Sequence, residues 1–249
     1  MIGKFLGLSL VFALSAPARA QVDLSTLDDA MPGPRTRVLV LGSVHLSQGG
    51  TKAFDPATLR PVLERLAAYK PDIVTIEAIP GETCDLMRRR AVYKDAVKTF
   101  CPDVAEAHAA TGLDASSALD AIDEAFKSWP AQPTSMQRRH LAALFLAAGE
   151  PASALAQWWQ LPEAERRTGD GLDDALVRAL RKREASANEN YQIAARLAAS
   201  LGLQRVYPVD DHTGDSLVIG DEKAFETAIR RGWDGACEET KRTRRRLQA

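Results

Sequence analysis

A chain of 249 residues, 45% of them hydrophobic, is long enough to bury one sizeable core, so we expect a single domain. The 32 basic residues nearly balance the 33 acidic ones, for a formal net charge of −1. A nucleic-acid-binding domain normally carries a basic excess with interleaved aromatic residues, and this sequence has neither outside its last residues. We therefore expect no nucleic-acid partner.

The first 20 residues have the pattern of a secretory signal peptide. Lys4 precedes an apolar run at 5–14, and the small-residue motif Ala18-Arg19-Ala20 marks the cleavage site. The run of about ten residues is short against the ~20 that span a bilayer. We expect a periplasmic or secreted bacterial protein with no stable membrane anchor after cleavage. Losing these residues leaves 30 basic against 33 acidic residues, a net charge of −3.

After an N-terminal arm at 21–35, a single α/β domain is expected over 36–249. Residues 37–41 (RVLVL) form an apolar, β-branched run that is typical of a strand buried on both faces. Asp55-Pro56 is a helix start, and the apolar spacing predicts a helix to Tyr69, with its regular part beginning near Thr58 because of Pro61.

A second strand is predicted at 72–76, which completes a βαβ unit with parallel strands. His45 and Glu77 then follow two parallel strands at the same sheet edge, and lie close together if the strands are direct neighbours. Ligands of such sheets bind outside the carboxyl ends of the strands. We therefore expect these two side chains to share one substrate, water or ion.

The stretch from about residue 84 to 160 is alanine-rich and helical in period. It predicts three or four helices, then a short one at 151–160, as a cap or side layer over the strand ends. Trp158 and Trp159 are interpreted as packing residues. His108 and His140 lie in charged, helical surroundings and are expected at the surface.

Export permits disulfide formation among the three cysteines. One straight helix would hold Cys84 and Cys101 ~25 Å apart, too far for a bridge. The turn-forming residues Pro80-Gly81 and Pro102 favour the bend that a bridge requires. Whether a Cys84–Cys101 disulfide forms, with Cys237 left free, stays open.

Residues 170–201 predict one long helix that ends at Gly202. Asparagine is disfavoured within helices, so the polar cluster at 188–191 needs a reason. Helical spacing puts Glu184, Asn188 and Tyr191 on one face, which either points at the strand edge or is solvated. A third strand is predicted at 204–209, and a last helix at 221–245 ends in a basic, solvated run.

Three predicted strands thus end in side chains suited to catalysis, which predicts an enzyme-like site. His45, Glu77 and Asp210 are the candidate catalytic residues. Either His45 and Glu77 hold a divalent metal (Zn, Mn or Fe) that activates water, or one of them acts as a general base without metal. Both routes lead to hydrolysis of a small-molecule or peptide substrate. The candidate ligand-contacting residues are Asn188, Tyr191, Asp211 and His212.

The motif Gly42-Ser43-Val44-His45 after a strand, with the later Glu77 and the series Asn188–Tyr191 and 205–210, resembles the superfamily of TraB/TIKI/GumN-type, erythromycin esterase-like and ChaN-like haem-binding proteins. Within it, the chain is similar to an uncharacterised exported bacterial family. The resemblance covers about residues 36–215. It implies a mainly parallel central sheet covered by helices, and metal-dependent peptide cleavage or water attack on an ester at His45 and Glu77, with Asp210 a looser match.

This sequence departs from that pattern at its end. Members of the superfamily usually continue to a last strand with another Gly-x-x-His-like element, whereas this chain stops in an arginine-rich helix. Two further readings follow. One is a haem or small-ligand binding protein with His45 as axial ligand, and the other is a truncated, non-catalytic member.

Overall fold

The computed structural model describes residues 33, 35–48, 54–217 and 219–247. The predicted signal peptide and most of the predicted N-terminal arm lie outside these residues. The chain divides into a short unit, residues 1–42, and a large unit, residues 43–249, which are described separately. The large unit is a helix-rich α/β structure with a small parallel sheet, which agrees with the predicted class but has a far smaller sheet than expected.

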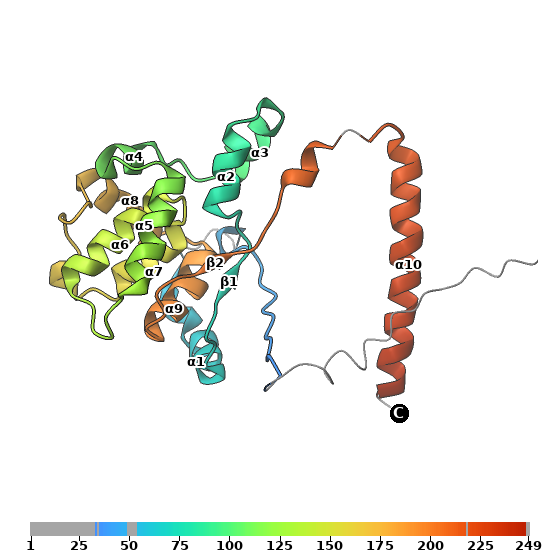
Figure 1. Cartoon of the computed structure of the whole chain (residues 1–249). Coiled ribbons are helices and arrows are strands. Elements are labelled where there is room, and N and C mark those ends of the chain that lie inside the picture. The colour runs from blue at the N-terminus through green and yellow to red at the C-terminus, as the bar shows by residue number, and fades with distance from the viewer. Residues whose placement is uncertain (1–32, 34, 49–53, 218, 248–249) are drawn as a thin grey trace, which may run out of the picture. The chain divides into compact units, whose positions relative to one another are not determined.

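Helices make up most of the described residues (Figure 1). The α-helices are α1 (Arg60–Tyr69), α2 (Gly81–Arg88), α3 (Lys94–Phe100), α4 (Ala105–Thr111), α5 (Ala115–Lys127), α6 (Ser135–Ala147), α7 (Pro151–Trp159), α8 (Asp174–Glu184), α9 (Arg196–Ser200) and α10 (Glu222–Leu247). A π-helix, η5, covers Asn190–Ala195, and 3₁₀ turns cover η1 (Leu46–Gln48), η2 (Pro56–Leu59), η3 (Ala91–Tyr93), η4 (Glu163–Glu165) and η6 (Thr213–Ser216). No helix among the described residues is both long and apolar enough to cross a membrane.

The sheet consists of β1 (Thr75–Ile76) and β2 (Tyr207–Pro208), which pair in parallel with Thr75 opposite Tyr207. Two of the three predicted strands are therefore confirmed, in shortened form. Backbone hydrogen bonds continue past both ends, and the last joins the Asp210 N–H to the Ala78 carbonyl at 3.0 Å. The segments after β1 and β2 consequently run side by side, as Figure 1 shows for the two strands.

The predicted strand at 37–41 is wrong. The structure assigns no strand to residues 35–48, and the side chains of Val38 and Val40 are exposed. A β-branched run becomes a strand only when a neighbouring strand accepts its backbone hydrogen bonds, and composition does not show whether that neighbour exists. The predicted βαβ unit of 37–41, α1 and 72–76 is therefore absent from the described structure, and β1 pairs with the distant β2 instead.

Asp55 begins the first helical segment as predicted. Its Oδ1 accepts the Ala57 N–H at 2.9 Å, a standard N-cap. A 3₁₀ turn accommodates Pro56, and the α-helix proper begins at Arg60 with Pro61 in its first turn, where its missing N–H costs nothing. Lys70, with a left-handed φ of 54°, ends it.

The predicted cap region supplies the centre of the core. α7 and the second half of α6 are almost fully buried; α6 packs on both α7 and α5. Five α-helices precede α7 in this region rather than three or four, because the chain also breaks between α2 and α3, at η3. Trp158 is fully buried, which confirms its packing role.

The predicted single helix over 170–201 is wrong, because the chain leaves the helix at 185–188 and re-enters it at 189. Local side-chain bonds stabilise the break. Ser186 Oγ donates to the Arg183 carbonyl, and Asn188 Oδ1 accepts the Asn190 N–H at 3.0 Å. Gln192 Nε2 then donates to the carbonyls of Glu184 and Ser186. The polar cluster thus ends one helix and begins the next.

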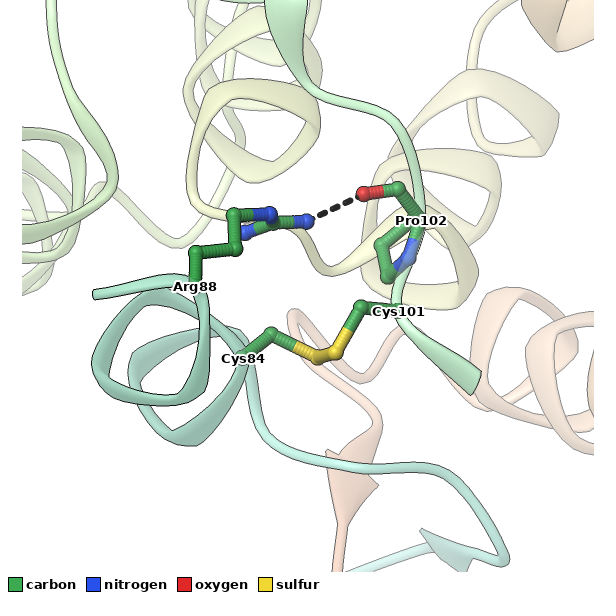
Figure 2. Close-up of a disulfide and its surroundings, with 4 residues drawn as sticks. All are labelled: Cys84, Arg88, Cys101 and Pro102. Carbon is green, nitrogen blue, oxygen red and sulfur yellow. Dashed lines mark hydrogen bonds between the residues drawn. A yellow bond between two sulfur atoms is a disulfide. The ribbon is translucent and has the colours of Figure 1, made fainter. Parts of the chain in front are cut away.

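A disulfide joins Cys84 of α2 to Cys101 after α3, with Cα atoms 5.7 Å apart (Figure 2). The bend that it requires lies between the two helices, at η3. Arg88 donates to the Pro102 carbonyl beside the bridge. Gly81 begins α2 against the end of α6, and a Cβ there would lie 1.7 Å from the Ala148 carbonyl oxygen, so the approach requires glycine. The bridge is therefore part of a closely packed lobe, α2–α3.

Candidate functional site

A cavity of about 350 Å³ lies where β1 and β2 end. This is where ligands bind in parallel sheets, and the volume is within the range of small-molecule sites. Four predicted site residues line it, namely Glu77, Asn188, Tyr191 and Asp210. Its other walls include Phe100 and Pro102 from the disulfide-bonded lobe, and Glu150 and Ser153 at the start of α7.

His45 contacts Glu189 rather than Glu77. Its Nδ1 lies 2.6 Å from Glu189 Oε1, and the Leu46 N–H donates to Glu189 Oε2 at 3.2 Å. A carboxylate only accepts hydrogen bonds, so the proton of this pair lies on Nδ1 when His45 is neutral. The Glu189 hydrogen bond and charge raise the pKa of His45, with a smaller contribution from the charge of Glu77. We call His45 and Glu189 the dyad.

Neither His45 nor Glu189 lines the cavity itself, but the helix break places Glu189 in a segment that does. Glu189 lies between Asn188 and Asn190, which both line the cavity. Asn190 Nδ2 donates to the Glu77 carbonyl at 3.0 Å, which ties the break to the end of β1. Burial opposes ionisation of Glu189, but hydrogen bonds from His45 and the backbone lower its pKa on balance. Glu189 is thus a fixed carboxylate, suited to orienting an imidazole.

Sequence reasoning placed His45 and Glu77 side by side through a strand that does not form. The hydrogen-bond partner of His45 is Glu189. That His45 and Glu77 share one substrate, water or ion stays a prediction. The signal for Glu189 was present, because a Glu among three polar residues in a helical stretch is unusual. Glu184, by contrast, accepts from Trp159 Nε1 at 2.9 Å and does not line the cavity, so the predicted common face with Asn188 and Tyr191 does not exist.

A second cluster follows β2. His212 Nδ1 lies 2.7 Å from Asp215 Oδ2, and its Nε2 lies 3.0 Å from Asp210 Oδ2. The hydrogen bond with Asp215 is the main cause of a raised His212 pKa, and the charges of both carboxylates add to it. The imidazole stacks on Phe100 with centroids 3.6 Å apart. Asp211 accepts the Thr213 N–H, so it stabilises the turn, and neither Asp211 nor His212 lines the cavity.

Glu150 forms the buried wall of the cavity. Arg205 holds its carboxylate through two hydrogen bonds, and Ser153 Oγ lies 3.2 Å from Oε2. The same hydroxyl donates to the Val206 carbonyl at 2.9 Å. These bonds fix α7 to the segment that leads into β2, so the cavity wall and the sheet form one hydrogen-bonded unit.

The remaining histidines have structural positions. His108 Nε2 lies 3.0 Å from the Ala147 carbonyl oxygen and is half-buried, whereas His140 is exposed as predicted. Within the described ranges, no three His, Cys, Asp or Glu side chains gather closely enough to hold a metal ion. The metal predicted at His45 and Glu77 stays a prediction.

Comparisons with known proteins do not assign the chain to a family. No family model, curated protein or solved structure matches the chain.

Proposed function

We propose that this protein is an exported hydrolase that uses water to cleave an ester or peptide bond. The observation that carries the proposal is the dyad, in which His45 Nδ1 lies 2.6 Å from Glu189 Oε1 and 60% of the His45 side chain is exposed. Glu189 lies between two residues that line the cavity, Asn188 and Asn190. With Nδ1 engaged, the Nε2 lone pair is the site that can accept a proton. A histidine oriented in this way is a suitable general base.

The proposed step needs no group beyond the substrate and water. Nε2 of neutral His45 takes a proton from a water molecule as the water oxygen bonds to the substrate carbonyl carbon. The Glu189 carboxylate stabilises the imidazolium that forms. Nε2 then returns the proton to the leaving oxygen or nitrogen as its bond to that carbon breaks. Asp210, Asn188 and Tyr191 line the cavity in which the substrate is bound.

The same geometry supports a ligand role for His45 as the second candidate. A histidine that binds a metal through one ring nitrogen commonly donates its other N–H to a carboxylate, as His45 does to Glu189. A divalent ion or a haem iron at Nε2 therefore stays a proposal, as do membership of the TraB/erythromycin esterase-like superfamily, its wider parallel sheet and the periplasmic location. No step above is routed through a metal.

A substrate panel tests the hydrolase proposal. Purified chain is assayed against p-nitrophenyl esters and fluorogenic peptides, with and without added divalent metal and after chelation. The comparison is with His45→Ala and Glu189→Gln. His140→Ala is the matched control, because His140 is exposed on α6 and does not line the cavity.

We expect turnover that is lost in His45→Ala and retained in His140→Ala. Equal rates in both variants would contradict the role of the dyad. Metal analysis and haem titration on the same samples separate the second candidate. Bound metal, or a Soret shift that disappears in His45→Ala without any turnover, would favour ligand binding over hydrolysis.

A further inference from the structure

The charged side chains that line the cavity are all acidic. They are Glu77, Glu150 and Asp210, and no lysine, arginine or histidine is among the lining residues. The proposed site consists of this cavity and the dyad. The sign of the lining charge then bears on which substrates enter it.

Two of these carboxylates have cationic partners, but the two differ in how far the partner's positive charge compensates the negative charge. Arg205 matches Glu150, whose side chain is only 2% exposed. Asp210 shares His212 with Asp215, so two carboxylates have at most one positive charge between them. The surroundings of Asp210 therefore keep a net negative charge whichever form His212 takes.

Glu77 is the carboxylate that the described residues leave available. It is exposed, and its side chain accepts no hydrogen bond from the described part of the chain. Its charge is nevertheless felt nearby, since it contributes to the raised pKa of His45. A carboxylate in a concave site that forms no ion pair with the described residues favours a positively charged partner over a neutral one.

The remaining walls limit the shape of that partner. Asn188, Asn190 and Tyr191 bring polar groups, whereas Ile76 and Val206 bring apolar surface. A volume of about 350 Å³ suits one small molecule or one side chain rather than a folded partner. The complementary ligand has an apolar body and a single cationic group.

We infer that the cavity binds the cationic part of the substrate, an amine or guanidinium group carried on an apolar body, with Glu77 as its counter-ion. This inference rests on the proposed function for the identity of the site, and it adds the class of substrate. Glu77 is then a specificity-determining residue, and His45 performs the proton transfer.

Binding measured without turnover tests the inference separately from the chemistry. Benzylamine and benzyl alcohol have the same apolar ring and differ in charge. Their dissociation constants are measured at neutral pH by NMR titration of the full chain, of Glu77→Gln and of Glu106→Gln. Glu106 is an exposed residue of α4 outside the cavity, so its variant removes one negative charge elsewhere.

We expect benzylamine to bind the unaltered chain at least about fivefold more tightly than benzyl alcohol, which corresponds to one partly exposed ion pair. Glu77→Gln removes that preference and Glu106→Gln keeps it. Equal binding of the two ligands, a preference that survives in Glu77→Gln, or no binding of benzylamine at millimolar concentration would overturn the inference. Amine-selective binding with no hydrolysis of any ester or peptide would instead refute the proposed function and leave the inference standing.

Discussion

Two regions of the molecule each place a histidine beside carboxylates, and they differ in what they leave open. In the dyad, His45 has one carboxylate at Nδ1 and is 60% exposed. After β2, His212 has Asp215 at Nδ1, Asp210 at Nε2 and Phe100 against its ring, and it is 22% exposed. Both have a raised pKa, but the carboxylates leave a ring nitrogen available to substrate in His45 alone.

Under the proposed function, His45 is the reactive histidine and His212 is a positioning one. A raised pKa follows from neighbouring carboxylates and is common to both regions, so it does not identify the base. The arrangement of hydrogen bonds does. His212 orients Asp210, a cavity-lining residue, and holds the segment after β2 against Phe100. We therefore assign proton transfer to His45 and support of the cavity to His212.

Substitution of the two histidines should have very different effects on kcat/KM. His45→Ala should lower kcat/KM by about 10²–10⁴, the usual contribution of a general base. His212→Ala should lower it by less than tenfold, because His212 acts through Asp210. Initial rates on the best substrate of the panel measure both. A larger loss in His212→Ala than in His45→Ala would reverse the assignment.

Reduction of the Cys84–Cys101 disulfide should destabilise the protein and affect the two histidine regions differently. Opening a bridge between residues 17 apart should lower the free energy of unfolding by about 3 kcal/mol. Phe100 lies next to Cys101, and Ser216 Oγ donates to the Val92 carbonyl within the loop that the bridge closes. Urea unfolding with and without reductant measures the loss.

NMR spectra of the same reduced sample give the second readout. The imidazole signals of His212 should shift and those of His45 should not, because only His212 contacts the bridged lobe. Equal shifts of the two histidines would show that the lobe does not act through Phe100.

Glu189→Gln should have an intermediate effect, of roughly tenfold on kcat/KM, below the full contribution of the base. Because Glu189 raises the pKa of His45, the rate of the unaltered chain should rise with pH through a midpoint above 6.5. The substitution should move that midpoint to lower pH. Asp215→Asn, the matched change beside His212, should leave it in place. A midpoint unchanged by Glu189→Gln would show that the Glu189 carboxylate does not set the pKa of the base.

The smallest expected effect concerns stability near His212. Its folded-state pKa is raised above 6.5, so its favourable contribution to stability is complete below about pH 6.5 and is lost as pH rises through the raised value. Asp215→Asn should therefore destabilise the protein more at pH 6 than at pH 9. Urea unfolding at both values measures this, and a destabilisation that grows with pH would have the wrong sign.

Sequence patterns located the residues that line the cavity better than the hydrogen-bond partner of His45. Glu77 and Asp210 follow short apolar runs, and strand ends in parallel sheets meet at one edge, so both were found. The 37–41 run was misassigned since strand formation depends on a neighbouring chain segment that residue types do not report. Pairing of Cys84 with Cys101 was left open, because the bend at η3 that brings them together depends on tertiary packing.

Glu189 was missed for a related reason. In a continuous helix it would lie one position away from the predicted face of Asn188 and Tyr191. The bonds of Ser186 and Asn188 to the backbone break that helix and turn Glu189 toward His45. Side-chain competition for backbone groups is visible in the sequence as a polar cluster, but its geometric outcome is not.

The most direct test of the account is the protonation state of the imidazole ring of His45, read by ¹⁵N NMR of the four histidines across pH in the unaltered chain and in Glu189→Gln. We expect a neutral His45 with its proton on Nδ1, an unprotonated Nε2, and a pKa above 6.5 that falls in Glu189→Gln. A neutral His45 protonated on Nε2, or a pKa that Glu189→Gln does not change, would contradict the assignment of His45 as the base.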